Sequence, residues 1–140
     1  MNILKILTEA RKTGNFGERA AARYLKKNGY RIVRKNYTVA DAEIDIIARK
    51  GQMLSFVEVK ARNINNVGGI ESRPAASVTP EKQRKIIKCA SCFLARYPEK
   101  PRISFDVIEV YLENCKSGVK VNEIKHIQNA FDKNTAYRRR

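Results

Sequence analysis

The chain has 140 residues, of which 43% are hydrophobic, a length and composition that suit one domain with an ordinary core rather than a disordered chain. Its 29 Lys and Arg residues against 14 Asp and Glu give a formal net charge of +15, which favours a nucleic acid or an anionic membrane as partner. No run reaches the length of a transmembrane helix and the start lacks the apolar core of a secretory signal, so we expect a cytoplasmic protein that does not bind a membrane.

The three cysteines, an odd number, argue against a disulfide framework. Cys89 and Cys92 lie at helical spacing within an apolar stretch, so we interpret them as core residues. A structural zinc site would need a second pair of ligands, and neither Cys115 nor His126 has the spacing that zinc sites use. We therefore expect neither disulfides nor structural zinc.

The N-terminal half of the chain predicts two helical segments, a strand and a β-hairpin. Residues 1–13 contain a short amphipathic segment that could pack on the body of the protein or on a partner. Gly29 follows the second helix at the position where helices commonly end in a left-handed residue. The other elements are a helix from Phe16 to Lys27, a strand from Arg31 to Tyr37, and two hairpin strands, Glu43 to Ala48 and Met53 to Lys60, joined by a turn at Arg49 to Gln52.

The C-terminal half predicts a loop, a helix and further strands. Asn63 to Val78 contains glycine, serine and proline without periodicity, which indicates a mobile loop beside the hairpin. The next elements are a helix from Thr79 to Tyr97, a strand from Arg102 to Leu112, a turn at Lys116 to Gly118, a short strand from Val119 to Val121 and an apolar-spaced segment from Ile124 to Phe131. Residues 132–140 are expected to be a basic, disordered tail. This order predicts an α/β fold, a small mixed β-sheet flanked by helices, in a single domain over residues 14–131.

The predicted hairpin brings two acids and a lysine to one face of the sheet. If Ala48 pairs with Met53, Asp45 and Glu58 become diagonal neighbours on one face. Lys60, two residues beyond Glu58, shares that face. A register slip of one residue would separate the acids, so this geometry depends on the turn as well as on the strands.

Two carboxylates and a lysine in this arrangement suit the hydrolysis of a phosphodiester. Mg²⁺ or Mn²⁺ polarises a phosphoryl oxygen and activates a bound water, and oxygen ligands such as Asp45 and Glu58 suit these ions. Lys60 would orient the attacking water or stabilise charge that develops on the phosphate. His126 stands without a Ser-His-Asp pattern, so acyl-transfer chemistry has little support.

A set of linked motifs from Gly14 to Phe131 resembles the YraN-like family of bacterial proteins. The motifs are Gly14-Asn-Phe-Gly17-Glu18, Lys35-Asn36-Tyr37, Glu43-Ile-Asp45-Ile-Ile-Ala48, Phe56-Val-Glu58-Val-Lys60-Ala-Arg62, Lys82-Gln83, Phe105-Asp-Val107 and Ala130-Phe131. Their order and spacing together are more specific than any one of them. The family is similar to the PD-(D/E)XK nuclease superfamily, so the resemblance implies a restriction endonuclease-like fold.

The resemblance also implies roles for five residues. Asp45 matches the first acid of the superfamily, Glu58 and Lys60 match its second acid and lysine, and Glu18 matches an acid that related enzymes place near the metal from the first helix. Gln83 corresponds to a polar residue that resolvase-like members bring to the same site. The implied catalytic residues are therefore these five, and the implied ligands of Mg²⁺ or Mn²⁺ are Asp45, Glu58 and Glu18.

Other interpretations of these residues remain open. Glu18 also forms a capping-box pattern with Asn15, three residues earlier. The charges of the hairpin strands could simply face solvent. Two positions depart from the pattern, since Ala42 stands where the family usually has glycine and Ile44 where superfamily members often have proline.

Basic residues around the expected site are candidates for contacts to the nucleic-acid backbone, although they could equally form a solvated face. They are Arg62, Arg73, Lys82, Arg84, Lys85 and Lys88. The sequence thus predicts a metal-dependent endonuclease acting on DNA, including branched or flapped structures, with a homodimer suggested by resolvase-like relatives. The alternatives are a nucleic-acid-binding module that does not cleave and an adaptor that docks a protein through its N-terminal segment.

Overall fold

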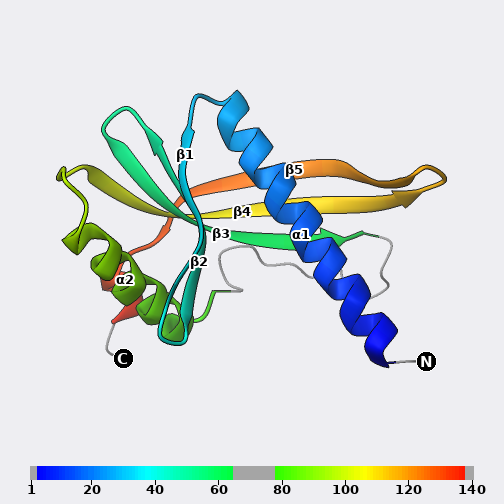
Figure 1. Ribbon diagram of the computed structural model, residues 1–140, viewed down its shortest axis with the longest axis horizontal. Coiled ribbons are helices and arrows are strands. Elements are labelled where there is room, and N and C mark those ends of the chain that lie inside the picture. Colours follow the sequence, from blue (N-terminus) through cyan, green and yellow to red (C-terminus); the bar gives the residue numbers. More distant parts are fainter. Residues whose placement is uncertain (1–2, 65–77, 138–140) are drawn as a thin grey trace.

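The computed structural model describes residues 3–64 and 78–137, with the backbone alone for residues 3–14 (Figure 1). The elements are, in chain order, α1 (Ile3–Lys27), β1 (Arg31–Val39), β2 (Ala42–Lys50), β3 (Met53–Asn63), α2 (Pro80–Ala95), β4 (Arg102–Cys115), β5 (Gly118–Phe131) and α3 (Lys133–Ala136). Most of the segment predicted to be a mobile loop, including Arg73, lies outside the described residues. No helix in the described part of the chain is both long and apolar enough to cross a membrane.

The five strands form one mixed sheet with the order β1-β2-β3-β4-β5. Neighbouring strands are antiparallel except for β3 and β4, which are parallel. The connection between these two parallel strands contains α2, as a parallel pair requires a crossover. The predicted α/β fold, a mixed sheet flanked by helices, is therefore confirmed, and it is consistent with a small restriction endonuclease-like fold.

Each face of the sheet carries its own apolar cluster. The cluster beneath α1 joins Ala21 and Leu25 of the helix to Val57 of β3. The cluster beneath α2 joins Ile87 of that helix to Phe56, the neighbour of Val57 on β3. Successive β3 residues thus face opposite helices, as the alternation of a strand requires, and the even-numbered residues of β3 lie on the side of α2.

The first helix is longer than the sequence predicts. α1 runs without interruption from Ile3 to Lys27, so residues 3–13 of the predicted N-terminal segment and the helix expected from Phe16 belong to one element (Figure 1). Glu18 therefore lies in the middle of a helix, and the capping-box interpretation with Asn15 is wrong. The predicted end is confirmed, since Gly29 has a φ of +89° just after α1.

The C-terminal region is also more regular than expected. β5 is one strand from Gly118 to Phe131 in place of a short strand and a separate segment, because it pairs with β4 along its whole length. Irregularities in that pairing disturb the alternation of β5, which hides the strand in the sequence. Residues 132–137 are not a disordered tail, since Asp132 and Thr135 form a capping box that begins α3 and Ala136 is buried.

Candidate functional site

The β2–β3 hairpin has a different register from the one predicted. Lys50, not Ala48, pairs with Met53, so the turn contains only two residues and begins at Gly51, whose φ is +59°. Because the register changes by two residues, the residues of β2 that pair with β3, Ile46 to Lys50, keep their predicted faces. The change also moves Asp45 from a position diagonal to Glu58 toward a position opposite it.

β2 and β3 separate from each other at Asp45. The last pair in the ladder is Ile46 with Val57. One residue further on, the Asp45 side chain takes the place of a backbone partner, since its Oδ2 accepts a hydrogen bond from the Val59 backbone N–H at 2.7 Å. Ile44 then packs in the cluster beneath α2 whereas Ile46 packs beneath α1, so β2, which remains paired with β1, turns as it separates from β3. The two strands form a fork with Asp45 at its base.

Three carboxylates from two elements meet at this fork. Oxygen atoms of Glu18 on α1 and of Glu43 and Asp45 on β2 lie within 4.8 Å of one another. Glu18 reaches the strands because α1 approaches β3 closely beside it, where a Cβ added to Gly17 would lie 2.6 Å from the Cβ of Ala61. Glu43 was not among the metal ligands expected from the sequence, although its spacing of two residues from Asp45 on a strand was a signal that both side chains point to one side.

Electrostatic interactions make this acidic cluster unfavourable without a counter-charge. The pKa of Asp45 is raised to about 7, first by burial and then by the negative charge of Glu58, against the lowering effect of the Val59 N–H. Burial, followed by the charge of Glu43, also raises the pKa of Glu18. Close acids and burial disfavour ionisation, and a bound cation reverses that effect. Three oxygen donors therefore fit a hard divalent ion such as Mg²⁺ or Mn²⁺.

Glu58 is held by two lysines. Its Oε1 lies 2.6 Å from Lys82 Nζ and 3.6 Å from Lys60 Nζ, and its side chain is only 7% exposed. Burial and the positive charge of Lys82 lower the pKa of Lys60. Of the three predicted metal ligands, the structure thus brings Glu18 and Asp45 together with Glu43, while Glu58 lies near enough to influence both but is paired with lysines.

The amide of Gln83 is engaged away from the acids. Gln83 is buried, its Nε2 donates to the Val78 carbonyl at 2.8 Å, and its Oε1 accepts from the Thr135 hydroxyl at 2.9 Å. These bonds connect the beginning of α2 to α3. The structure therefore does not bring Gln83 to the acidic cluster, and it explains the residue as a link between two helices.

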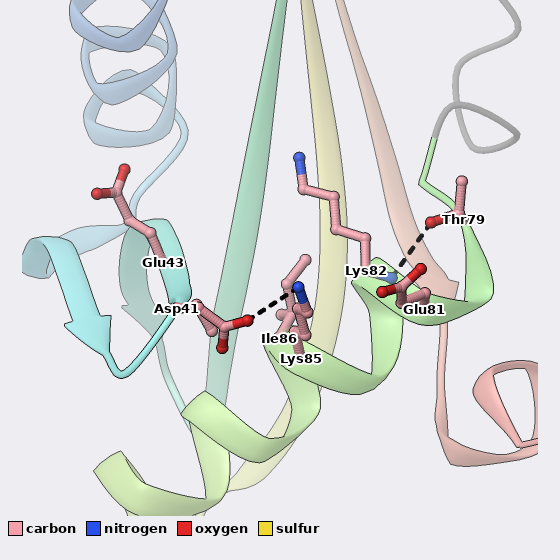
Figure 2. A pocket seen from close by; sticks show the side chains of 8 residues that line it. Asp41, Glu43, Thr79, Glu81, Lys82, Lys85 and Ile86 are labelled. Atoms are coloured by element: carbon pink, nitrogen blue, oxygen red, sulfur yellow. Dashed lines mark hydrogen bonds and ion pairs between the residues drawn. The ribbon is translucent and has the colours of Figure 1, made fainter.

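A hollow of ≈ 340 Å³ lies between the β1–β2 turn and the beginning of α2 (Figure 2). Glu43 and Lys82 line it, so it connects the acidic cluster and the Glu58 pair to the surface. Lys85 also lines it and pairs with Asp41 at 2.9 Å. The hollow presents both signs of charge at one opening.

The other predicted basic contacts are spread over several surroundings. Lys88 is exposed on α2, whereas Arg84 donates to the Ala136 carbonyl at 2.7 Å and so holds α3 against α2. Arg62 is half-buried on β3, and within the described residues its Nε has no hydrogen-bond partner. Among the predicted basic contacts that the structure describes, only Lys82 and Lys85 line the hollow.

Comparison with known proteins identifies the family. The family described as "Uncharacterised protein family UPF0102" matches residues 17–110. A UPF0102 protein of Desulfosudis oleivorans is 41% identical over 132 residues, which cover 94% of this chain and 98% of the relative. Another, from Chlorobium phaeobacteroides, is 40% identical over 120 residues, or 84% of this chain and 92% of the relative. The chain therefore belongs to the UPF0102 family, the YraN-like group that its motifs resemble.

Proposed function

We propose that this protein is a nuclease that uses Mg²⁺ or Mn²⁺ to hydrolyse phosphodiester bonds of DNA. The observation that carries the proposal is the cluster of Glu18, Glu43 and Asp45 at the fork, next to Glu58 and Lys60. Carboxylates with raised pKa values lie beside a lysine whose pKa is lowered. Ionisable groups perturbed in this way are typical of reaction sites. The similarity of the motifs to PD-(D/E)XK nucleases supports the same reading by analogy.

Each residue of the site has a distinct task in this proposal. Glu18, Glu43 and Asp45 would hold the divalent ion, which when bound supplies a Lewis acid and lowers the pKa of a water. The Val59 N–H keeps the Asp45 carboxylate oriented. Glu58 orients Lys60, whose ammonium would stabilise negative charge on the phosphate or hold the attacking water.

The substrate follows from charge and access. A net charge of +15 favours a polyanion, and the lysines that line the hollow place positive charge beside the acids. The resemblance to resolvase-like enzymes makes branched or flapped DNA the substrate that we propose. Cutting both strands of a duplex would need two copies, so a cytoplasmic homodimer is part of the proposal.

The test is cleavage of labelled single-stranded, duplex, flap and four-way-junction DNA in Mg²⁺ or Mn²⁺. We expect the wild type to cut at least one substrate and Asp45→Asn to cut it about 100-fold or more slowly with DNA binding unchanged. The matched control is Asp41→Asn, which makes the same chemical change at an exposed acid of the same hollow and should keep the activity. Tight binding by the wild type without cleavage of any substrate would contradict the proposal and favour the non-catalytic binding module.

A further inference from the structure

Lys82 extends from the first turn of α2 toward the sheet, while Lys85, on the next turn, turns toward Asp41 (Figure 2). The base of Lys82 is fixed, because its backbone N–H donates to the Thr79 hydroxyl that caps the helix. Its ammonium then reaches Glu58 Oε1 at 2.6 Å. A side chain of the helix thus crosses the space beside the acidic cluster and ends on an acid of β3.

The two lysines at Glu58 are not equivalent. Lys60 projects from the same strand as Glu58, and its side chain is 22% exposed. Lys82 comes from a different element, is 42% exposed, and lies closer to the carboxylate. A long, partly solvated stem can swing away from its partner at little steric cost, whereas a half-buried lysine on the strand cannot. Lys60 is therefore the fixed cation and Lys82 the movable one.

The charge around Glu58 explains why a second cation is there. Glu58 interacts unfavourably with both Asp45 and Glu18, so four carboxylates act on one another in a half-buried region. A single lysine does not balance them. The ammonium of Lys82 is stabilised by Asp45 as well as by Glu58, with which it pairs at 2.6 Å, so it acts as a counter-charge to more than one residue of the acidic group.

We propose that Lys82 is the resident counter-ion of this acidic site and that binding of the divalent metal displaces it from Glu58. The proposal rests on the proposed function, because it concerns the same metal. A divalent cation and an ammonium compete for the same negative field, so the ion can bind fully only when Lys82 gives up its place. The displaced ammonium remains on the wall of the hollow, where the phosphate of a substrate would enter.

The test measures binding of Mn²⁺ alone, by isothermal titration calorimetry on the full chain without DNA. We expect Lys82→Gln, which removes the charge and keeps a hydrogen-bond donor for Glu58, to bind Mn²⁺ at least about fivefold more tightly than the wild type. Lys85→Gln is the matched control, because it makes the same substitution on the same helix and in the same hollow but at the Asp41 pair. Its affinity for Mn²⁺ should stay within about twofold of the wild type, since exposed charges are screened.

The outcomes separate this inference from the function on which it rests. If the wild type binds Mn²⁺ and Lys82→Gln binds it equally or less tightly, the proposed displacement of Lys82 by the metal is overturned. The metal site would still stand, and Lys82 would be a structural link from α2 to β3. An equal gain in Mn²⁺ affinity for Lys85→Gln would also overturn the proposal, because the effect would then come from the overall charge of the protein and not from the position of Lys82. Absence of Mn²⁺ binding by all three proteins would overturn the exchange and the metal-dependent function together. If Lys82→Gln fails to fold, Lys82→Met supplies the same comparison without the hydrogen bond.

Discussion

Asp106 and Asp45 are both aspartates in the interior of the sheet, and their surroundings are opposite. Asp106, on the α1 side of β4, accepts hydrogen bonds from His126 Nε2 at 2.8 Å, from the Asn129 backbone N–H at 3.1 Å and from the Ser104 hydroxyl. Asp45 accepts one from the Val59 N–H and otherwise faces other acids. A buried carboxylate with several donors is a structural element, whereas one surrounded by acids favours a cation.

The network around Asp106 also joins three elements. His126 lies on β5, and its Nδ1 is 3.3 Å from the Tyr24 hydroxyl of α1. The network therefore connects the first helix to the last two strands on the face away from α2. This network holds α1, the helix that carries Glu18, against the sheet. The acids at the fork are instead held together by the fold, although their negative charges repel one another.

We expect the greatest difference in the free energy of unfolding between variants that lack one or the other of these two aspartates. Asp106→Ala removes the acceptor of three hydrogen bonds and the buried partner of His126, so we expect a loss of about 3–5 kcal/mol in the free energy of unfolding. Asp45→Ala in EDTA removes a charge that burial and the other acids disfavour at pH 7, so we expect no loss of stability and a gain of up to about 4 kcal/mol. Urea denaturation at pH 7 measures both values. Equal destabilisation by the two substitutions would contradict the conclusion that Asp106 stabilises the fold and Asp45 does not.

A somewhat smaller effect concerns pH. The folded-state pKa of Asp45, about 7, is above its ordinary value of 3.8, so the folded chain binds this proton more tightly than the unfolded chain. The stability from this group is complete below about pH 4 and is lost as pH rises through about 7, by on the order of 4 kcal/mol.

Urea denaturation of the metal-free protein across this pH range, beside Asp45→Asn, measures that contribution. The variant should lack the decline that belongs to Asp45, and saturating Mn²⁺ should restore stability to the wild type at pH 7. Identical pH profiles for the two proteins would contradict the raised pKa of Asp45.

The smallest of these effects concerns the contact that brings Glu18 to the strands. Gly17→Ala improves helix propensity but places a Cβ against Ala61, so we expect a net destabilisation of about 1–2 kcal/mol and weaker Mn²⁺ binding. Ala61→Gly in the same chain removes the atom in conflict and should restore the affinity for Mn²⁺. If the double variant binds Mn²⁺ as poorly as Gly17→Ala, the close approach of α1 and β3 is not what positions Glu18.

Features that depend on short stretches of chain could be predicted from the sequence. Alternation identified the strands of the hairpin, and Thr79 with Pro80 indicated the beginning of α2. Because a strand has a period of two, Glu58 was expected near both Asp45 and Lys60 even with the register wrong by two residues, and the structure brings it to each of them. The α/β class followed from the order of the elements.

Contacts between residues that are distant in the chain could not be predicted from the sequence and became apparent in the folded protein. Periodicity reports the face on which a side chain lies, but it carries no information on how closely two elements pack. The approach of α1 at Gly17 brings Glu18 to Glu43, and the position of α2 gives Lys82 to Glu58. The partner of Gln83 could not be predicted from periodicity either, because its amide accepts a hydrogen bond from α3, a helix that the sequence did not predict. Alternation along a strand determines toward which face a side chain points, and packing between elements determines how far apart two side chains lie.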